Sequence, residues 1–166
     1  YATAACTGGA HMDARRGFAQ GFDRYTEEHE LGHALTWIKK QRRRKFFLFF
    51  HTYQVHDPYV HPERWVELFD DTGYQGPLRD TMARLRGGTG AWDERHRVFW
   101  EGVERTDPRA VAFVTSLYDA GIRRMDAETL APLLDRLEEF GLTRDTLVVF
   151  TSDHGEAFAE HGAFLH

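Results

Sequence analysis

Ionisable side chains that could do chemistry together follow directly after an apolar run near the end of the sequence. Asp153 and His154 come after the run 146–151, whose residues 147–150 are apolar, and Gly155 next to them permits a tight turn. Where a chain turns, a carboxylate and a neutral imidazole at neighbouring positions can converge on one cation. The other interpretation is a loop aspartate that caps the next helix beside an exposed histidine. The dipeptide alone leaves both interpretations open.

A second candidate, His56, lies in the segment Val55-His-Asp-Pro-Tyr59. Pro58 disfavours a helix at Asp57, so we expect an extended or turning loop after the apolar run 46–50. An imidazole in such a loop can donate to an anionic oxygen or protonate a leaving group. Because the chain has ten histidines, a surface histidine in a proline turn is the competing interpretation. His51, at the end of the same run, is interpreted as structural.

The single cysteine is predicted to be a buried structural thiol. Cys6 lies in an apolar run, and no basic residue close in the sequence could lower its pKa. One cysteine also excludes an internal disulfide and a metal site built from cysteines alone.

Three apolar runs are predicted to be buried strands, and helical patterns separate them. Residues 46–50, Phe-Phe-Leu-Phe-Phe, lack polar alternation, which indicates a strand covered on both faces. Apolar positions at helical spacing predict a helix over about 28–44 and a long helical segment after the Asp107-Pro108 start signal. Pro132 makes that segment either a kinked helix or two helices. The remaining expected elements are strands over 1–6 and 146–151, and short helices and loops over about 65–104.

Strands that alternate with helices predict an α/β layered domain with a largely parallel sheet. Ligands of such sheets gather at the carboxyl ends of the strands. We therefore expect residues 51–57 and the Asp153-His154 pair to meet at one edge of the sheet.

Composition narrows the classes of partner. The chain has 166 residues and a formal net charge of -5, which argues against a general nucleic-acid binder. No apolar run approaches the roughly 20 residues that span a bilayer. The basic run 39–45 could bind a polyanion, but a solvated helix end that complements the helix dipole is the favoured interpretation.

Four blocks of the sequence, in order, resemble the sulfatase family of the alkaline-phosphatase-like superfamily. They are YATAACTGGAHMDARRGFAQGFDRY, FFLFFHTYQVHDPYVHP, LYDAGIRRMDAETLAPLLDRLEEFGL and TLVVFTSDHGEAFAEHG, and they cover most of the chain outside residues 67–105. The resemblance implies a three-layer α/β/α sandwich with a mainly parallel sheet. It also implies that residues 1–166 are an internal part of a longer catalytic domain.

The resemblance assigns roles to four positions. Asp153 and His154 match the two metal ligands, and His56 matches a histidine that contacts the sulfate or phosphate or assists the leaving group. His166 matches a residue that binds the same anion. Glu156 and Glu160 are expected to be solvated or to lie behind the ligands.

The activity implied is metal-dependent hydrolysis of sulfate esters of small molecules or glycans. One divalent cation, calcium, would act beside a serine or formylglycine nucleophile expected upstream of Tyr1. We therefore expect the 166-residue chain by itself to show no esterase activity. A periplasmic or extracellular location is implied by the resemblance alone.

Two alternatives stay open. A phosphoester or phosphonate hydrolase, or a phosphoethanolamine transferase, of the same superfamily would use manganese or zinc. A scaffold module that has lost the enzyme is disfavoured, because Asp153, His154, His56 and His166 all stand at motif positions.

Overall fold

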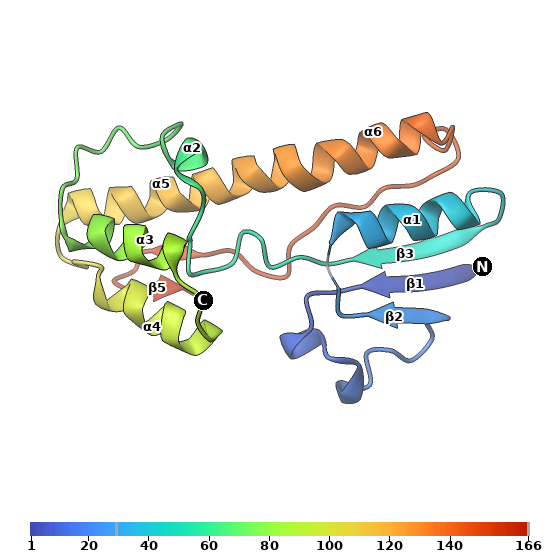
Figure 1. Ribbon diagram of the computed structural model, residues 1–166, viewed down its shortest axis with the longest axis horizontal. Helices are drawn as coiled ribbons and strands as arrows, with labels where there is room; N and C mark the ends of the chain where they lie inside the picture. The colour runs from blue at the N-terminus through green and yellow to red at the C-terminus, as the bar shows by residue number, and fades with distance from the viewer. Residues whose placement is uncertain (29, 166) are drawn as a thin grey trace. The chain divides into compact units, whose positions relative to one another are not determined.

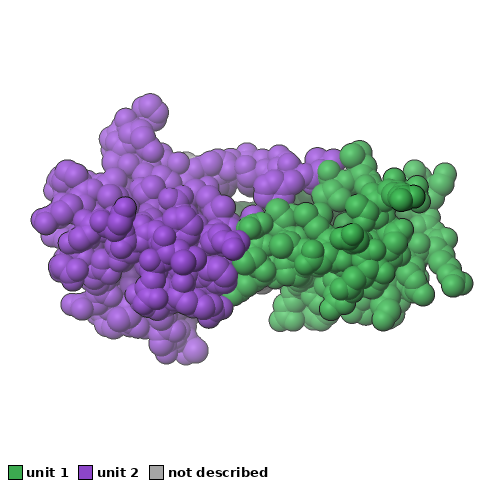
Figure 2. All heavy atoms as spheres, turned by 90° about the horizontal axis from the view of Figure 1, so that it is seen from above, with its two compact units in different colours: residues 1–54, 126–148 green, residues 55–125, 149–166 purple. Residues whose placement is uncertain are grey.

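The computed structural model describes residues 1–28 and 30–165 (Figure 1). They form two compact units, which are coloured separately in Figure 2. Unit 1 comprises residues 1–54 and 126–148, and unit 2 comprises residues 55–125 and 149–166. Each unit is described by itself below. None of the helices in the described part of the chain combines the length and the apolar character that a membrane crossing requires.

Unit 1 is built on a small parallel sheet, as the alternating pattern predicts. Its strands are β1 (Ala2–Cys6), β2 (Arg24–Thr26) and β3 (Phe46–Phe50), in the order β2-β1-β3. Helices α1 (Leu31–Gln41) and α6 (Ala131–Glu139) belong to the same unit. A core of small residues from β1 and larger ones from the helices joins them, with Ala2, Ala4, Trp37, Ile38 and Leu137 all buried.

Strand β3 is covered on one face only, so the expectation of cover on both faces is wrong for the described residues. Phe46 and Leu48 pack against the core of unit 1. Phe47 and Phe49, which point to the other face, are 51% and 36% exposed. Side chains alternate between the two faces of a strand, and here α1 and α6 supply a layer for one face. The complete three-layer sandwich therefore stays a prediction.

Residues 146–151 do not form the expected buried strand. They are irregular chain without ladder partners among the described strands. Leu147, Val149 and Phe150 are 88%, 76% and 68% exposed. A strand is stable only when neighbours satisfy its backbone and cover its side chains, and β3 pairs with β1 alone among the described strands. The sequence pattern indicates a preference for a strand, and none of the described strands pairs with these residues.

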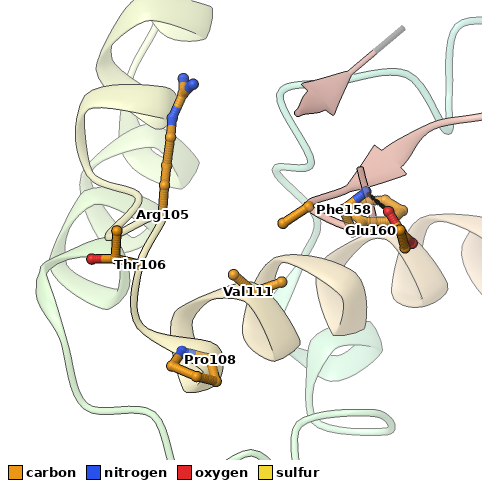
Figure 3. Close-up of a pocket in the computed structure, with 7 residues that line it drawn as sticks. Arg105, Thr106, Pro108, Val111, Phe158 and Glu160 are labelled. Atoms are coloured by element: carbon orange, nitrogen blue, oxygen red, sulfur yellow. Dashed lines mark hydrogen bonds between the residues drawn. The ribbon is translucent and has the colours of Figure 1, made fainter. Parts of the chain in front are cut away.

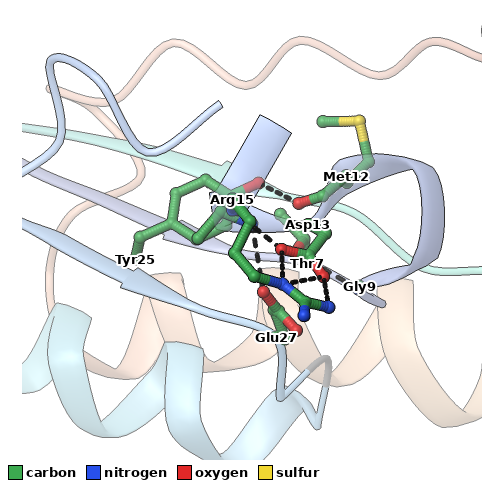
Figure 4. A network of polar contacts seen from close by, with 8 residues as sticks. Thr7, Gly9, Met12, Asp13, Arg15, Tyr25 and Glu27 are labelled. Atoms are coloured by element: carbon green, nitrogen blue, oxygen red, sulfur yellow. Dashed lines mark hydrogen bonds and ion pairs between the residues drawn. The ribbon is translucent and has the colours of Figure 1, made fainter. Parts of the chain in front are cut away.

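The turn after β1 is fixed by a polar network (Figure 4). Asp13 caps the short 3-10 helix Ala14–Arg16, and its carboxylate accepts from the backbone and side chain of Arg15. These bonds lower the pKa of Asp13 to about 2. Tyr25 of β2 donates to the Met12 carbonyl at 2.5 Å, and Glu27 accepts from the Ala14 amide.

Cys6, at the end of β1, is 2% exposed, and burial raises the pKa of its thiol. The prediction of a buried thiol is confirmed.

Unit 2 is mostly helical. It contains α2 (Glu63–Val66), α3 (Pro77–Gly87), α4 (Trp92–Glu101) and α5 (Pro108–Met125), and a two-stranded antiparallel ribbon of β4 (Ala157–Phe158) and β5 (Phe164–Leu165). The short helices confirm the prediction for residues 65–104. One aromatic-rich core joins these elements, with Tyr59, Phe99 and Phe113 at 0–1% exposure.

The helical segment after Asp107 begins and changes as its sequence predicts. Asp107 accepts from the Arg109 amide at 2.9 Å, which satisfies a donor at the helix start. One stretch of π-helix, Asp126–Leu130, separates α5 from α6. Pro132 lies in the first turn of α6, directly after this π-helical stretch. Gly141 ends α6 with a positive φ of 69°.

Candidate active site

The loop that carries His56 is held from inside unit 2 by the residues that follow it. Tyr59 is fully buried among Phe99, Trp100 and Tyr118, with ring centroids 5.7–6.2 Å from its own. The side chain of Asp57 is 2% exposed. The histidine therefore stands on a segment whose neighbours are anchored in the core.

Asp57 is the centre of a buried polar cluster. Its carboxylate accepts a hydrogen bond from Trp100 Nε1 at 2.8 Å and lies 3.0 Å from His96 Nε2. Its other oxygen lies 3.0 Å from His56 Nδ1. Burial by itself would raise the pKa of Asp57, but the bonds from His56 and Trp100 outweigh it, so the pKa is lowered. A buried carboxylate with three such donors is a rigid anchor for each of them.

Nδ1 of His56 makes two contacts with Asp57. Nδ1 lies 2.9 Å from the Asp57 carbonyl oxygen and 3.0 Å from its carboxylate, and both oxygens can only accept. Nδ1 therefore carries a proton, and Nε2 is the nitrogen that can act on a ligand. The hydrogen bond to Asp57 is the main cause that raises the pKa of His56 to about 9. At neutral pH this imidazole is a cation with a proton to donate.

His154 lies beside His56, with ring centroids 6.2 Å apart in an edge-to-face arrangement. Its Nδ1 lies 2.8 Å from the Gly155 carbonyl oxygen, which can only accept, so the proton of the neutral ring is on Nδ1. Nε2 is then the basic nitrogen, and it lies 3.9 Å from Asp153 Oδ1. Asp153 itself is open to solvent, with 84% of its side chain exposed.

These two side chains fit a divalent cation as a partial site. Oxygen and nitrogen ligands lie about 2.0–2.6 Å from such ions, so two donors 3.9 Å apart can reach the same ion. The Gly155 carbonyl fixes the tautomer that metal-binding histidines need. Within residues 1–28 and 30–165, however, no group of three or more His, Cys, Asp or Glu side chains is arranged to hold a metal.

The expected meeting of the two stretches at one sheet edge is corrected by the structure. The loop of His56 follows β3 in the chain, but no strand leads to Asp153. Contacts within unit 2 bring His154 to His56 instead. His166, the fourth residue assigned by resemblance, lies outside the described residues.

Of the two alternatives expected for Glu156, the structure agrees with a position behind the candidate site and not with a solvated carboxylate. Glu156 is partly buried, and together with burial its charge raises the pKa of Tyr59. It also contributes to the raised pKa of His56. Glu160 is exposed, as expected, and accepts from the Phe158 amide at 2.5 Å. It borders a hollow of about 350 Å³ with Arg105, Thr106 and Val111 (Figure 3), which contains none of the four assigned residues.

Sequence reasoning missed His96 and Trp100. Both lie on α4, in the stretch that the four blocks leave uncovered. Their spacing of four residues puts them on one face of a helix. This spacing is the feature of the sequence that could have pointed to them. Nothing in the sequence says that this face meets Asp57.

Comparison with known proteins agrees with the four blocks. The family model described as "Sulfatase" matches residues 7–166. An arylsulfatase of Klebsiella aerogenes is 28% identical over 143 residues, which are 80% of this chain and 31% of that protein. A multifunctional alkaline phosphatase superfamily protein of Trinickia caryophylli is 28% identical over 138 residues, 77% of this chain and 27% of that protein.

A sulfotransferase of low-salt glycan biosynthesis from Haloferax volcanii is 63% identical over 30 residues, 18% of this chain. No solved structure matches. The chain thus spans about a third or less of the length of these curated relatives. The match of the family model over nearly the whole chain shows that this protein belongs to the sulfatase family, with its alkaline-phosphatase-like α/β fold.

Proposed function

We propose that the full-length protein hydrolyses sulfate esters and that His56 acts on the ester while Asp153 and His154 hold a divalent cation. The observation that carries this proposal is the clamp on His56. Asp57 holds Nδ1 at 3.0 Å, and the ring edge meets His154 at a centroid distance of 6.2 Å. A proton donor thus stands next to two potential cation ligands.

In sulfate ester hydrolysis the bond between sulfur and the alcohol oxygen breaks, and that oxygen must gain a proton. His56 is suited to supply it from Nε2, because Nδ1 is already committed to Asp57. The imidazole that remains can recover a proton from water. Before bond breaking, the same N–H can bind an oxygen of the charged sulfate.

Bound to Asp153 and His154, a divalent cation would neutralise the ester charge and lower the pKa of the nucleophile. Asp153 contributes the negative charge and the hard oxygen that calcium prefers. His154 contributes Nε2, with its proton kept on Nδ1 by the Gly155 carbonyl. We propose calcium as this ion.

The test is a comparison of 4-nitrophenyl sulfate with 4-nitrophenyl phosphate as substrates of the full-length protein. Each is assayed after removal of metal and again with added calcium, manganese or zinc. We expect the sulfate ester to be the better substrate and calcium to restore its turnover. Faster turnover of the phosphate ester with zinc or manganese would support the phosphoester hydrolase alternative. Turnover of neither ester under any of these conditions would contradict both.

A further inference from the structure

A cavity of about 630 Å³ in unit 2 is lined by three arginines, and no carboxylate stands among its described lining residues. The arginines are Arg86, Arg95 and Arg124, which come from α3, α4 and α5. Its volume is within the range of about 300–1,000 Å³ that ligand pockets occupy. The cavity contains none of His56, Asp153 and His154, so it is distinct from the candidate active site.

Two of the arginines are fixed by contacts that leave part of each guanidinium available. Arg95 donates from Nη1 to the carbonyls of Leu85 and Gly88, at 3.0 and 2.9 Å. Arg86 donates from Nε to the His61 carbonyl at 2.8 Å and is paired with Glu63. A guanidinium has five N–H donors, so these bonds use only some of them. They also hold the groups in place before any ligand arrives.

The charge of the cavity favours an anion. Carbonyl oxygens are neutral, so the hydrogen bonds of Arg95 do not offset its positive charge. Two carboxylates lie nearby: Glu63 is paired with Arg86, and Glu94 lies next to Gly90. The three lining guanidinium groups outnumber these two carboxylates. Arginine stays protonated at all ordinary pH values. The whole chain, in contrast, has a net charge of -5. A local concentration of guanidinium groups in an acidic protein is typical of oxyanion recognition.

The remaining wall suits an organic ligand better than a bare ion. Val60, Pro62 and Leu85 supply apolar surface, and Thr89 adds a hydroxyl group. We propose that this cavity binds a sulfate or carboxylate group carried on a sugar-sized carbon skeleton. Arginines would hold the oxyanion while the apolar side chains contact the skeleton. Such a ligand would have a binding site here whether or not it is hydrolysed.

Calorimetric titration of the full-length protein with sucrose octasulfate tests this site. Sucrose is the uncharged control. Citrate tests whether the site binds carboxylate groups, and inorganic sulfate tests whether it binds a bare ion. Arg124→Gln should weaken binding of sucrose octasulfate about tenfold, the usual scale for one charge-assisted hydrogen bond. Arg97→Gln is the matched control, because Arg97 is on α4 but exposed and paired with Glu101. It should change the affinity less than about twofold.

A second pair of variants leaves every arginine contact intact. A Cβ at Gly90 would meet Glu94 Oε2 at 3.5 Å and Arg95 Cγ at 3.7 Å, both ordinary contacts, so a side chain is tolerated there. Gly90→Asp adds a negative charge to the lining and should weaken binding about tenfold, while the isosteric Gly90→Asn should change it little.

Equal losses in the Arg124 and Arg97 variants, or in the Asp and Asn variants, would overturn the site, because general attraction or shape would then explain binding. Absence of any binding by sucrose octasulfate would overturn it too. If inorganic sulfate binds as tightly as sucrose octasulfate, the proposed contacts with the carbon skeleton are contradicted. Since none of these titrations needs turnover, their outcome is independent of the proposed hydrolysis.

Discussion

The two halves of the candidate active site differ in how unit 2 holds them. The side chain of Asp57, which holds His56, is 2% exposed and has three nitrogen partners within 3.0 Å. Asp153 has 84% of its side chain exposed, and its preceding residues lack strand partners in the described chain. The proposed proton donor is therefore preorganised by this chain, whereas the proposed cation ligands need further groups to become a complete site.

Replacing the proton donor should have the largest effect on activity. His56→Gln in the full-length protein should reduce kcat for a sulfate ester about 100-fold to 10,000-fold, the usual contribution of a general acid. Steady-state kinetics measure this loss. Thermal unfolding of the same variant is the control for folding. A loss below about tenfold would contradict the assigned role.

Replacing the anchor should affect both stability and the pKa of His56. Asp57→Asn removes a buried charge that three donors share, and we expect it to destabilise the fold by about 1–3 kcal/mol. The pKa of His56 should fall from about 9 toward its ordinary value of 6.5. NMR titration of the metal-free protein measures it. An unchanged pKa would show that Asp57 does not hold this proton.

The pH dependence of stability follows from the same contact. The pKa of His56 is raised on folding, from 6.5 to about 9. The stabilising contribution of its proton is therefore complete below about 6.5 and is lost as the pH rises through about 9. Denaturant unfolding at a series of pH values should show the gap between wild type and Asp57→Asn narrowing across this range. A constant gap would contradict the linkage.

Replacing the exposed residue Asp153 should have little effect on stability and a large effect on cation binding. Asp153→Asn should change the stability of the metal-free protein by less than about 0.5 kcal/mol, because its side chain lies in solvent. Affinity for calcium should fall at least about tenfold. Calorimetry measures the affinity and urea unfolding the stability. A large loss of stability without metal would show that Asp153 is held more tightly than its exposure indicates.

The smallest effect is expected from the exposed residues before Asp153. Val149→Thr should change the free energy of unfolding of the 166-residue chain by less than about 0.5 kcal/mol, since Val149 is 76% exposed. Val114→Thr is the buried counterpart, at 0% exposure, and should cost about 1–3 kcal/mol because a hydroxyl group enters the core. Similar losses in both variants would contradict the difference in burial.

Local signals predicted the helices well. The Asp107-Pro108 start and the helical spacing of apolar residues over about 28–44 act within one or two turns, so their effect is visible in the sequence. Strands depend on distant partners, and the apolar residues 146–151 have none among the described strands. The pattern gave the correct preference for β1 and β3 but could not say which faces would be covered.

Prediction of the candidate site has the same limit, because local patterns do not report contacts between residues far apart in the sequence. Pro58 indicates a loop at His56, and the resemblance assigned His56, Asp153 and His154. The resemblance did not reach α4, so His96 and Trp100 were missed. Their role depends on a contact with Asp57 across 39 to 43 positions of sequence, and no local pattern reports such a contact.

The most direct test of His56 as the proton donor compares two sulfate esters with leaving groups of different acidity. Full-length wild type and His56→Ala are assayed with 4-nitrophenyl sulfate, whose leaving group needs little protonation, and with phenyl sulfate, whose leaving group needs more. If His56 donates the proton, the variant loses much more kcat with phenyl sulfate than with 4-nitrophenyl sulfate. Equal losses with both esters would contradict proton donation by His56.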